Sequence, residues 1–201
     1  MRSFILFILF AAFTAVQFAQ EETLIEFGDQ TGGFGGPVAK FTSINSRGAI
    51  MLGARGGWIF DHSFVVGGGI YTLVSEVDAP ENILPAQGPL DIDFSYFGLE
   101  AEYVLQPSSL IHYNFYLFVG AGAVRFLKDV GSFSKNNTQV EETDLTFVLE
   151  PAANAELNVT DWCRVMAGVS YRITTGVTQV GLKNSDFTGL AASLTAKFGS
   201  F

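Results

Sequence analysis

Cysteine is almost absent from this chain, because only one, Cys163, occurs among its 201 residues. A lone cysteine forms no intrachain disulfide, and Cys163 is too far from the amino terminus to carry an amino-terminal lipid. Basic residues are also scarce: 11 Lys and Arg stand against 20 Asp and Glu, for a net charge of -9. No basic run exists, so nucleic acid is not an expected partner, since phosphate binding needs clustered Lys and Arg.

Long apolar runs are missing after the first twenty residues, MRSFILFILFAAFTAVQFAQ. This stretch places Arg2 before an apolar segment and ends in small or polar residues, which is the layout of a secretory signal peptide. We expect cleavage after Ala19, giving a signal peptide of 1–19, an amino-terminal extension of 20–36 and one domain over 37–201. A membrane-anchoring helix is the alternative, although the apolar run is short for a spanning helix.

A helical period is missing too, and a period of two takes its place. In residues 144–159, DLTFVLEPAANAELNV, the odd positions are nearly all apolar and the even positions carry Asp144, Glu150 and Glu156. Successive side chains of a strand point to opposite faces, so this alternation predicts a β-strand with one apolar and one polar face. Eight such segments are expected, over 37–46, 48–60, 63–73, 93–105, 113–126, 143–159, 162–173 and 188–200. The pattern of 37–46 and 63–73 does not settle which face is which.

The links between these segments alternate in length. Those around His62, before Tyr113 and before Trp162 are short, whereas 74–92, 127–142 and 174–187 are long and polar. In an antiparallel meander the short turns would share one end and the long loops the other, which is the asymmetry of transmembrane β-barrels. Only the short first link, around Asn45, breaks this scheme.

Aromatic residues gather at the short turns. A belt of this kind suits a membrane interface, because Tyr and Trp rings have an apolar body and a hydrogen-bonding group. The alternative is that they are core aromatics of a soluble β-protein, but the polar faces hold mostly Gly, Ala, Ser and Thr and few charges. The expected belt consists of Trp58, Phe60, Phe64, Tyr103, Tyr113 and Trp162.

The sparse charges of the strands should face a lumen. An Arg or Lys side chain facing lipid near the midplane costs about 2–4 kcal/mol, so the apolar face must be the outer one. Unpaired charges inside would also be costly, and a matched network of ion pairs is expected. It comprises four acids and four bases: Glu100, Glu102, Glu150, Glu156, Arg55, Arg164, Arg172 and Lys197.

With its leader, its eight alternating segments and its terminal Phe201, the chain resembles the small outer-membrane β-barrels of Gram-negative bacteria, the OmpA-like and OmpX-like group. The resemblance covers residues 37–201 and rests on layout. It implies a bacterial outer-membrane location, outer-membrane lipid as surroundings and the barrel-insertion machinery as a partner that reads the carboxy-terminal aromatic. The apolar positions Leu190, Leu194 and Phe198 are out of step with Phe201, and a bulge near Gly199 would restore the register.

Some outer-membrane barrels are enzymes that modify lipid, and such chemistry needs a nucleophile near the outer face. Here His62 and His112 fall in expected periplasmic turns, Cys163 reads as a small apolar residue, and no metal-ligand spacing occurs. We therefore expect no catalytic, metal or cofactor site. An eight-stranded barrel has an interior that side chains fill, which predicts a structural or surface-interaction protein. A narrow pore or carrier of small hydrophobic molecules is the alternative, and a lipid-modifying enzyme a third.

The long loops are acidic. Residues 74–93 hold Glu76, Asp78, Glu81, Asp91 and Asp93, and the next loop holds Glu141, Glu142 and Asp144. They are expected to face outward, where they would either attract a cationic extracellular partner or divalent ions, or simply keep the loops solvated.

Overall fold

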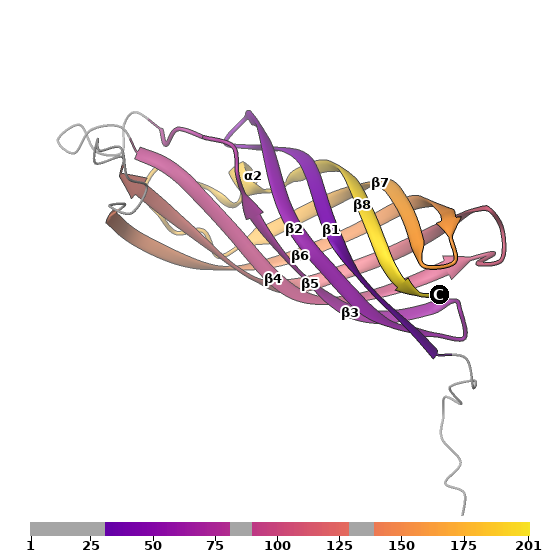
Figure 1. Cartoon of the computed structure of the whole chain (residues 1–201). Coiled ribbons are helices and arrows are strands. Elements are labelled where there is room, and N and C mark those ends of the chain that lie inside the picture. Colours follow the sequence, from indigo (N-terminus) through magenta and orange to yellow (C-terminus); the bar gives the residue numbers. More distant parts are fainter. Residues whose placement is uncertain (1–30, 81–89, 129–138) are drawn as a thin grey trace, which may run out of the picture.

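Eight antiparallel strands form a closed barrel in which each strand pairs with the next along the chain and the last pairs with the first (Figure 1). The computed structural model describes residues 31–80, 90–128 and 139–201, with the backbone alone at 128 and 139–142. The strands are β1 Thr31–Ile44, β2 Arg47–Phe60, β3 Phe64–Leu73, β4 Leu90–Leu105, β5 Ile111–Lys128, β6 Gln139–Thr160, β7 Cys163–Thr175 and β8 Gly189–Ser200. The predicted all-β, eight-stranded barrel is confirmed. The expected leader lies outside the described residues.

Several strands are longer than expected, and two differences change the architecture. Strand β1 begins at Thr31 instead of residue 37, so the glycine-rich stretch that ends at Pro37 belongs to the barrel wall. A short helix, α2 Asn184–Phe187, interrupts the loop between β7 and β8, where no helical pattern was expected. Four residues are too few to show a helical period in a sequence. No helix within the described ranges is long and apolar enough to cross a bilayer.

The barrel wall is apolar outside and closely packed inside. On β4, for example, Phe97 and Leu99 are largely exposed while Phe94 and Tyr96 are buried. The two strands whose faces the pattern left open are now assigned: even-numbered residues of β1 point inward, and odd-numbered residues of β3 do. An exposed apolar belt around a lumen that contains charges is the reverse of a soluble sandwich, and it suits a barrel that spans a bilayer.

The strand connections place the long loops at one end of the barrel. The first link is a two-residue turn in which Asn45 and Ser46 both have positive φ angles, as in the hairpin turns whose twist matches that of the flanking strands. The carboxyl terminus lies at the opposite end, with the short turns (Figure 1). The barrel therefore has a short-turn end, expected to be periplasmic, and a long-loop end.

Loop residues close the long-loop end of the lumen. Val77 from the β3–β4 loop, Leu182 from the β7–β8 loop and Phe187 from α2 are all buried in the main apolar cluster. The Phe187 ring lies 5.0 Å from that of Phe94 on the inner face of β4. The upper lumen is thus filled by apolar and aromatic side chains, and the charged residues lie below them.

Candidate functional site

The charged residues of the strands gather inside the barrel. Their inward orientation follows from the two-residue period, because each lies on the face opposite to the apolar, outward-facing positions. Apart from Arg164, which is partly exposed, each of the eight expected lumen residues is at least 96% buried: Arg55, Glu100, Glu102, Glu150, Glu156, Arg172 and Lys197. Burial of so many charges requires that they be paired.

The larger cluster lies toward the short-turn end. Arg55 on β2 donates from Nε to Glu100 Oε2 and from Nη2 to Glu102 Oε2, both at 2.7 Å. Lys197 on β8 then bridges Glu102 Oε1, at 2.8 Å, and Glu156 Oε2, at 2.6 Å. These contacts connect β2, β4, β6 and β8 across the lumen. We call this group, together with His112 and Asn114 on β5 and Arg164 on β7, the lower cluster.

The lower cluster continues onto β5 and β7 through Glu156. Asn114 donates to Glu156 Oε2 at 3.1 Å, and Arg164 Nη1 lies 3.4 Å from Glu156 Oε1. His112 Nε2 is 3.3 Å from the same Oε1 atom. The prediction that His112 lies in a short periplasmic turn was wrong: β5 begins at Ile111, so His112 is already on the inner face, and it is fully buried.

A second cluster lies nearer the middle of the lumen and centres on Glu150. Lys40 Nζ donates to Glu150 Oε1 at 2.8 Å, Ser170 donates to the same atom at 2.5 Å, and Tyr96 donates to Oε2 at 2.8 Å. We call these four residues the upper cluster. Lys40 was missed by the sequence reasoning, because the period of residues 37–46 did not assign a face. No local signal would have found it, because Val38 and Ile44, apolar residues of the same parity as Lys40, also point inward.

Arg172 requires a correction. It is fully buried, but no carboxylate in the described part of the chain pairs with it. Its guanidinium donates from Nε to the Phe187 carbonyl oxygen at 2.7 Å, and from Nη2 to Thr42 Oγ1 at 3.4 Å. Arg172 therefore holds α2 over the lumen, and Lys40 takes its place as the fourth base of the ion pairs.

Aromatic rings and one glycine complete the site. Tyr71 donates to Glu100 Oε1 at 2.7 Å, and Lys40 Nζ lies 3.6 Å from the centre of the Tyr71 ring. Tyr71 thus contacts both clusters, through a hydrogen bond and a cation–π contact. A Cβ atom on Gly69 would come within 2.9 Å of both Glu100 Oε1 and the Tyr71 hydroxyl. The absence of a side chain there lets this hydrogen bond form.

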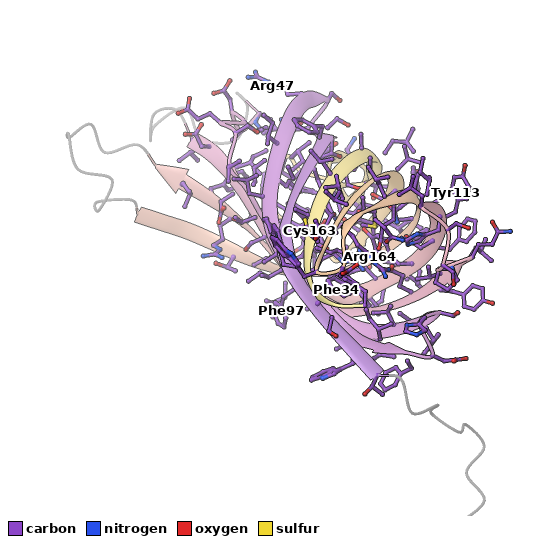
Figure 2. All side chains as sticks on the ribbon, turned by 45° about the vertical axis from the view of Figure 1, so that its right-hand side comes forward. Phe34, Arg47, Phe97, Tyr113, Cys163 and Arg164 are labelled. Atoms are coloured by element: carbon purple, nitrogen blue, oxygen red, sulfur yellow. The ribbon has the colours of Figure 1, made fainter. Side chains whose placement is uncertain are left out.

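The expected belt aromatics lie on the outer surface near the short turns. Trp58, Phe64, Tyr103, Tyr113 and Trp162 are exposed, and Phe60 is half-buried. Figure 2 shows Tyr113, with Phe97 further along the wall, on the outside of the ribbon. Trp162 also stacks on Phe198, with ring centres 6.0 Å apart.

Phe201 lies beyond the end of β8 and covers the short-turn end of the lumen. Its ring stacks 6.4 Å from that of Phe34, and the Arg164 guanidinium carbon is 4.0 Å from its centre. The expected bulge near Gly199 is absent, because the pairing of β1 with β8 has one constant register from Ala191 to Ser200. Phe201 therefore keeps the inward parity of its strand, opposite to Phe198.

The loop acids form contacts within the long-loop end. Asp78 pairs with Arg47, and Asp93 with Arg125. Asp144 accepts hydrogen bonds from the backbone N–H groups of Thr178 and Gln179, each at 2.6 Å. These acids hold loops and strand ends together. Glu81, Glu141 and Glu142, which were expected to share the acidic surface, lie outside the described side chains.

The remaining chemical candidates do not assemble into a site. Cys163 is partly exposed at the start of β7, and His62 lies in the short turn between β2 and β3. Within the described ranges, no three His, Cys, Asp or Glu residues are grouped so that they could hold a metal ion. The buried acids and bases of the lumen are bonded chiefly to one another.

No protein-family model matches the chain, and no curated protein sequence does. Solved structures do match. The amino-terminal β-barrel domain of OprF from Pseudomonas aeruginosa aligns with a TM-score of 0.50 at 12% identity, covering 85% of this chain and 99% of that one. Neisserial surface protein A aligns with a TM-score of 0.48 at 16% identity, covering 85% and 96%. The attachment invasion locus protein Ail of Yersinia pestis, solved with the heparin analogue sucrose octasulfate, gives 0.46 at 15% identity, covering 84% and 97%.

The OprF match concerns the fold alone, and it agrees with the closed eight-stranded meander described above. A charged lumen inside an apolar, aromatic-bordered wall needs a bilayer around it. The chain is a small eight-stranded β-barrel with the fold of bacterial outer-membrane barrels.

Proposed function

We propose that this protein is a closed, non-conducting barrel with a structural or cell-surface role, whose packed lumen holds the extracellular loops in place. The observation that supports it best is the pair of ion-pair clusters across the lumen. Lys197 links β8 to β4 and β6, and Lys40 links β1 to β6. Side chains that bond across the lumen leave little path for a hydrated ion.

The loops give the proposal a second support. Phe187 and Leu182 are buried at the long-loop end, and Arg172 donates to the Phe187 carbonyl from below. An eight-stranded barrel has an interior just wide enough for side chains. Closure by loops above and by ion pairs below favours a rigid support over a passage for solutes. In the same proposal, Phe201 is the residue that the barrel-insertion machinery reads.

Planar-bilayer recordings test the proposal against the narrow-pore alternative. The wild-type barrel should give no steady current. A Lys40→Ala/Glu150→Ala variant, which removes an ion pair without leaving an unpaired charge, should raise the conductance, whereas the outer-surface variant Leu149→Ala should not. A steady ion current through the wild type would overturn the proposal and support the pore.

An enzyme role is tested separately, because some outer-membrane barrels modify lipid. Mass spectrometry of outer-leaflet lipid, from cells with and without the protein, should give the same species. A lipid species that depends on expression of the protein would replace the structural proposal with an enzymatic one.

A further inference from the structure

Three buried oxygen atoms, on strands β6 and β8 that flank β7, have no hydrogen-bond partner among the described residues: Asn154 Oδ1 on β6, and Ser193 Oγ and Thr195 Oγ1 on β8. Each of these residues is more than nine-tenths buried. A buried polar atom without a partner is costly, so native proteins satisfy such atoms with protein groups or with bound water.

The strand register brings these three residues together. Asn154 pairs with Gly168 on β7, and Gly168 pairs with Ser193 on β8. Asn154, Gly168 and Ser193 therefore form one inward-facing row across three strands. Thr195 is the next inward-facing residue after Ser193 on the same strand. The site thus occupies one short stretch of the inner wall.

Gly168 allows Asn154 to reach toward β8. A Cβ atom on Gly168 would lie only 1.9 Å from Asn154 Oδ1, so the amide oxygen occupies the space above the glycine. Because neighbouring strands are about 4.8 Å apart, Ser193 is one strand spacing further on. This separation is too long for a direct hydrogen bond, but one water with two bonds of about 2.8 Å spans it.

The orientation of the Asn154 amide follows from its neighbours. Glu156 is a carboxylate that accepts from Asn114 Nδ2, so Asn114 turns its own oxygen toward Asn154. Asn154 must then present its NH2 group, and it donates to Asn114 Oδ1 at 2.7 Å. Its Oδ1 atom is left facing Gly168 as an acceptor.

The surroundings select a neutral ligand. Lys40 is paired with Ser193 in the register of β1 and β8, and Lys197 lies two residues beyond Thr195 on the inner face. These two ammonium groups disfavour a cation. Glu150 and Glu156, which accept from them, disfavour an anion. Two hydroxyl groups, which can donate or accept, and one amide oxygen, which accepts, together provide the partners that a water molecule needs.

We propose that Asn154, Ser193 and Thr195 form a buried water site over Gly168, and that the bound water extends the lower cluster as far as Ser193, which neighbours Lys40 of the upper cluster. Asn154 is the end of the lower cluster, through Asn114 and Glu156. Ser193 lies beside Lys40 of the upper cluster. The proposal concerns the cohesion of the lumen and does not depend on the non-conducting role.

A high-resolution crystal structure of the wild-type barrel provides the direct test. We expect solvent density within hydrogen-bonding distance of Asn154 Oδ1, Ser193 Oγ and Thr195 Oγ1. An absence of such density, or a direct hydrogen bond between Asn154 and Ser193, would overturn the proposal.

The sign of a stability change provides the second test, in detergent and urea. Thr195→Val keeps the side-chain shape and removes the hydroxyl. If the hydroxyl is bonded to water, its loss lowers the unfolding midpoint, whereas removal of a dry, unsatisfied hydroxyl would raise it. Thr72→Val, at an exposed outer position of β3, is the matched control and should leave the midpoint near that of the wild type. A raised or unchanged midpoint for Thr195→Val contradicts the water site.

Discussion

Lys40 and Glu150 form an ion pair at the centre of the barrel, with 2.8 Å between Nζ and Oε1 and both side chains fully buried. Removing one partner of such a pair leaves an uncompensated charge, which costs about 3–5 kcal/mol of unfolding free energy. Glu150→Leu should therefore lower the unfolding midpoint in detergent and urea more than the outer-surface variant Leu149→Ala. Equal losses in the two variants would contradict a packed, charged lumen.

The double variant Lys40→Met/Glu150→Leu tests whether the stability lost in Glu150→Leu comes from leaving Lys40 buried without its partner. Because it removes both charges together, it should recover part of the stability that Glu150→Leu loses. If the two single losses simply add in the double variant, then the pair contributes nothing as a pair, and the loss in Glu150→Leu has another origin.

Asp144 should hold the β7–β8 loop closed. Its carboxylate accepts from the Thr178 and Gln179 backbone and, at 2.9 Å, from the Thr178 hydroxyl. Since a hydrogen bond to a charged group contributes about 1.5–3 kcal/mol, Asp144→Ala should speed trypsin cleavage after exposed Lys183 on whole cells about tenfold or more. Asp144→Asn keeps one acceptor oxygen and should have a smaller effect. Cleavage at the wild-type rate in both variants would show that Asp144 does not control the loop.

The orientation of the barrel can be read by labelling single cysteines in a Cys163→Ser background. Ser185→Cys in α2 and Asp161→Cys in the last short turn are both at exposed positions. An impermeant maleimide should label the first on intact cells and the second only after lysis, because the long-loop end is expected outside. The opposite pattern would mean that the topology is inverted.

Deletion of Phe201 tests its proposed role as an assembly signal. The fraction of protein from cells that changes its apparent mass on boiling should fall, because closed barrels resist detergent and unassembled chains do not. Refolding of the purified variant in detergent should stay close to the wild type, since Phe201 is only partly buried and packs at the rim of a small apolar cluster, on Phe34 and beneath Arg164. Phe198→Ala, on the opposite face of β8, is the control. Unchanged assembly in cells would refute the role. If both assembly in cells and refolding in detergent decreased, Phe201 would contribute to packing and would not act as an assembly signal.

The sequence by itself determined the number of strands, their order and most of their faces. Alternation along 143–159 was enough to orient Glu150 and Glu156 inward, because a strand has only two faces and lipid rejects charge from one of them. The lengths of the links distinguished the two ends of the barrel for a similar reason, since each connection in an antiparallel meander must lie at one end or the other. Such signals are local, so they can be read without knowing which strands meet.

Tertiary structure alone decided which charges meet. Lys40 and Glu150 are 110 positions apart in the chain, and the glycine-rich start of β1 carries no alternation to orient Lys40. Arg172 shares the inward parity of the acids, yet α2 lies above it and accepts its hydrogen bond through the Phe187 carbonyl. Parity tells which face a side chain takes. The position of a side chain along the barrel axis, and the residues that it contacts, depend on the relative register of all eight strands and on loops that fold back into the barrel. A period of two in the sequence specifies neither the register nor the loop fold.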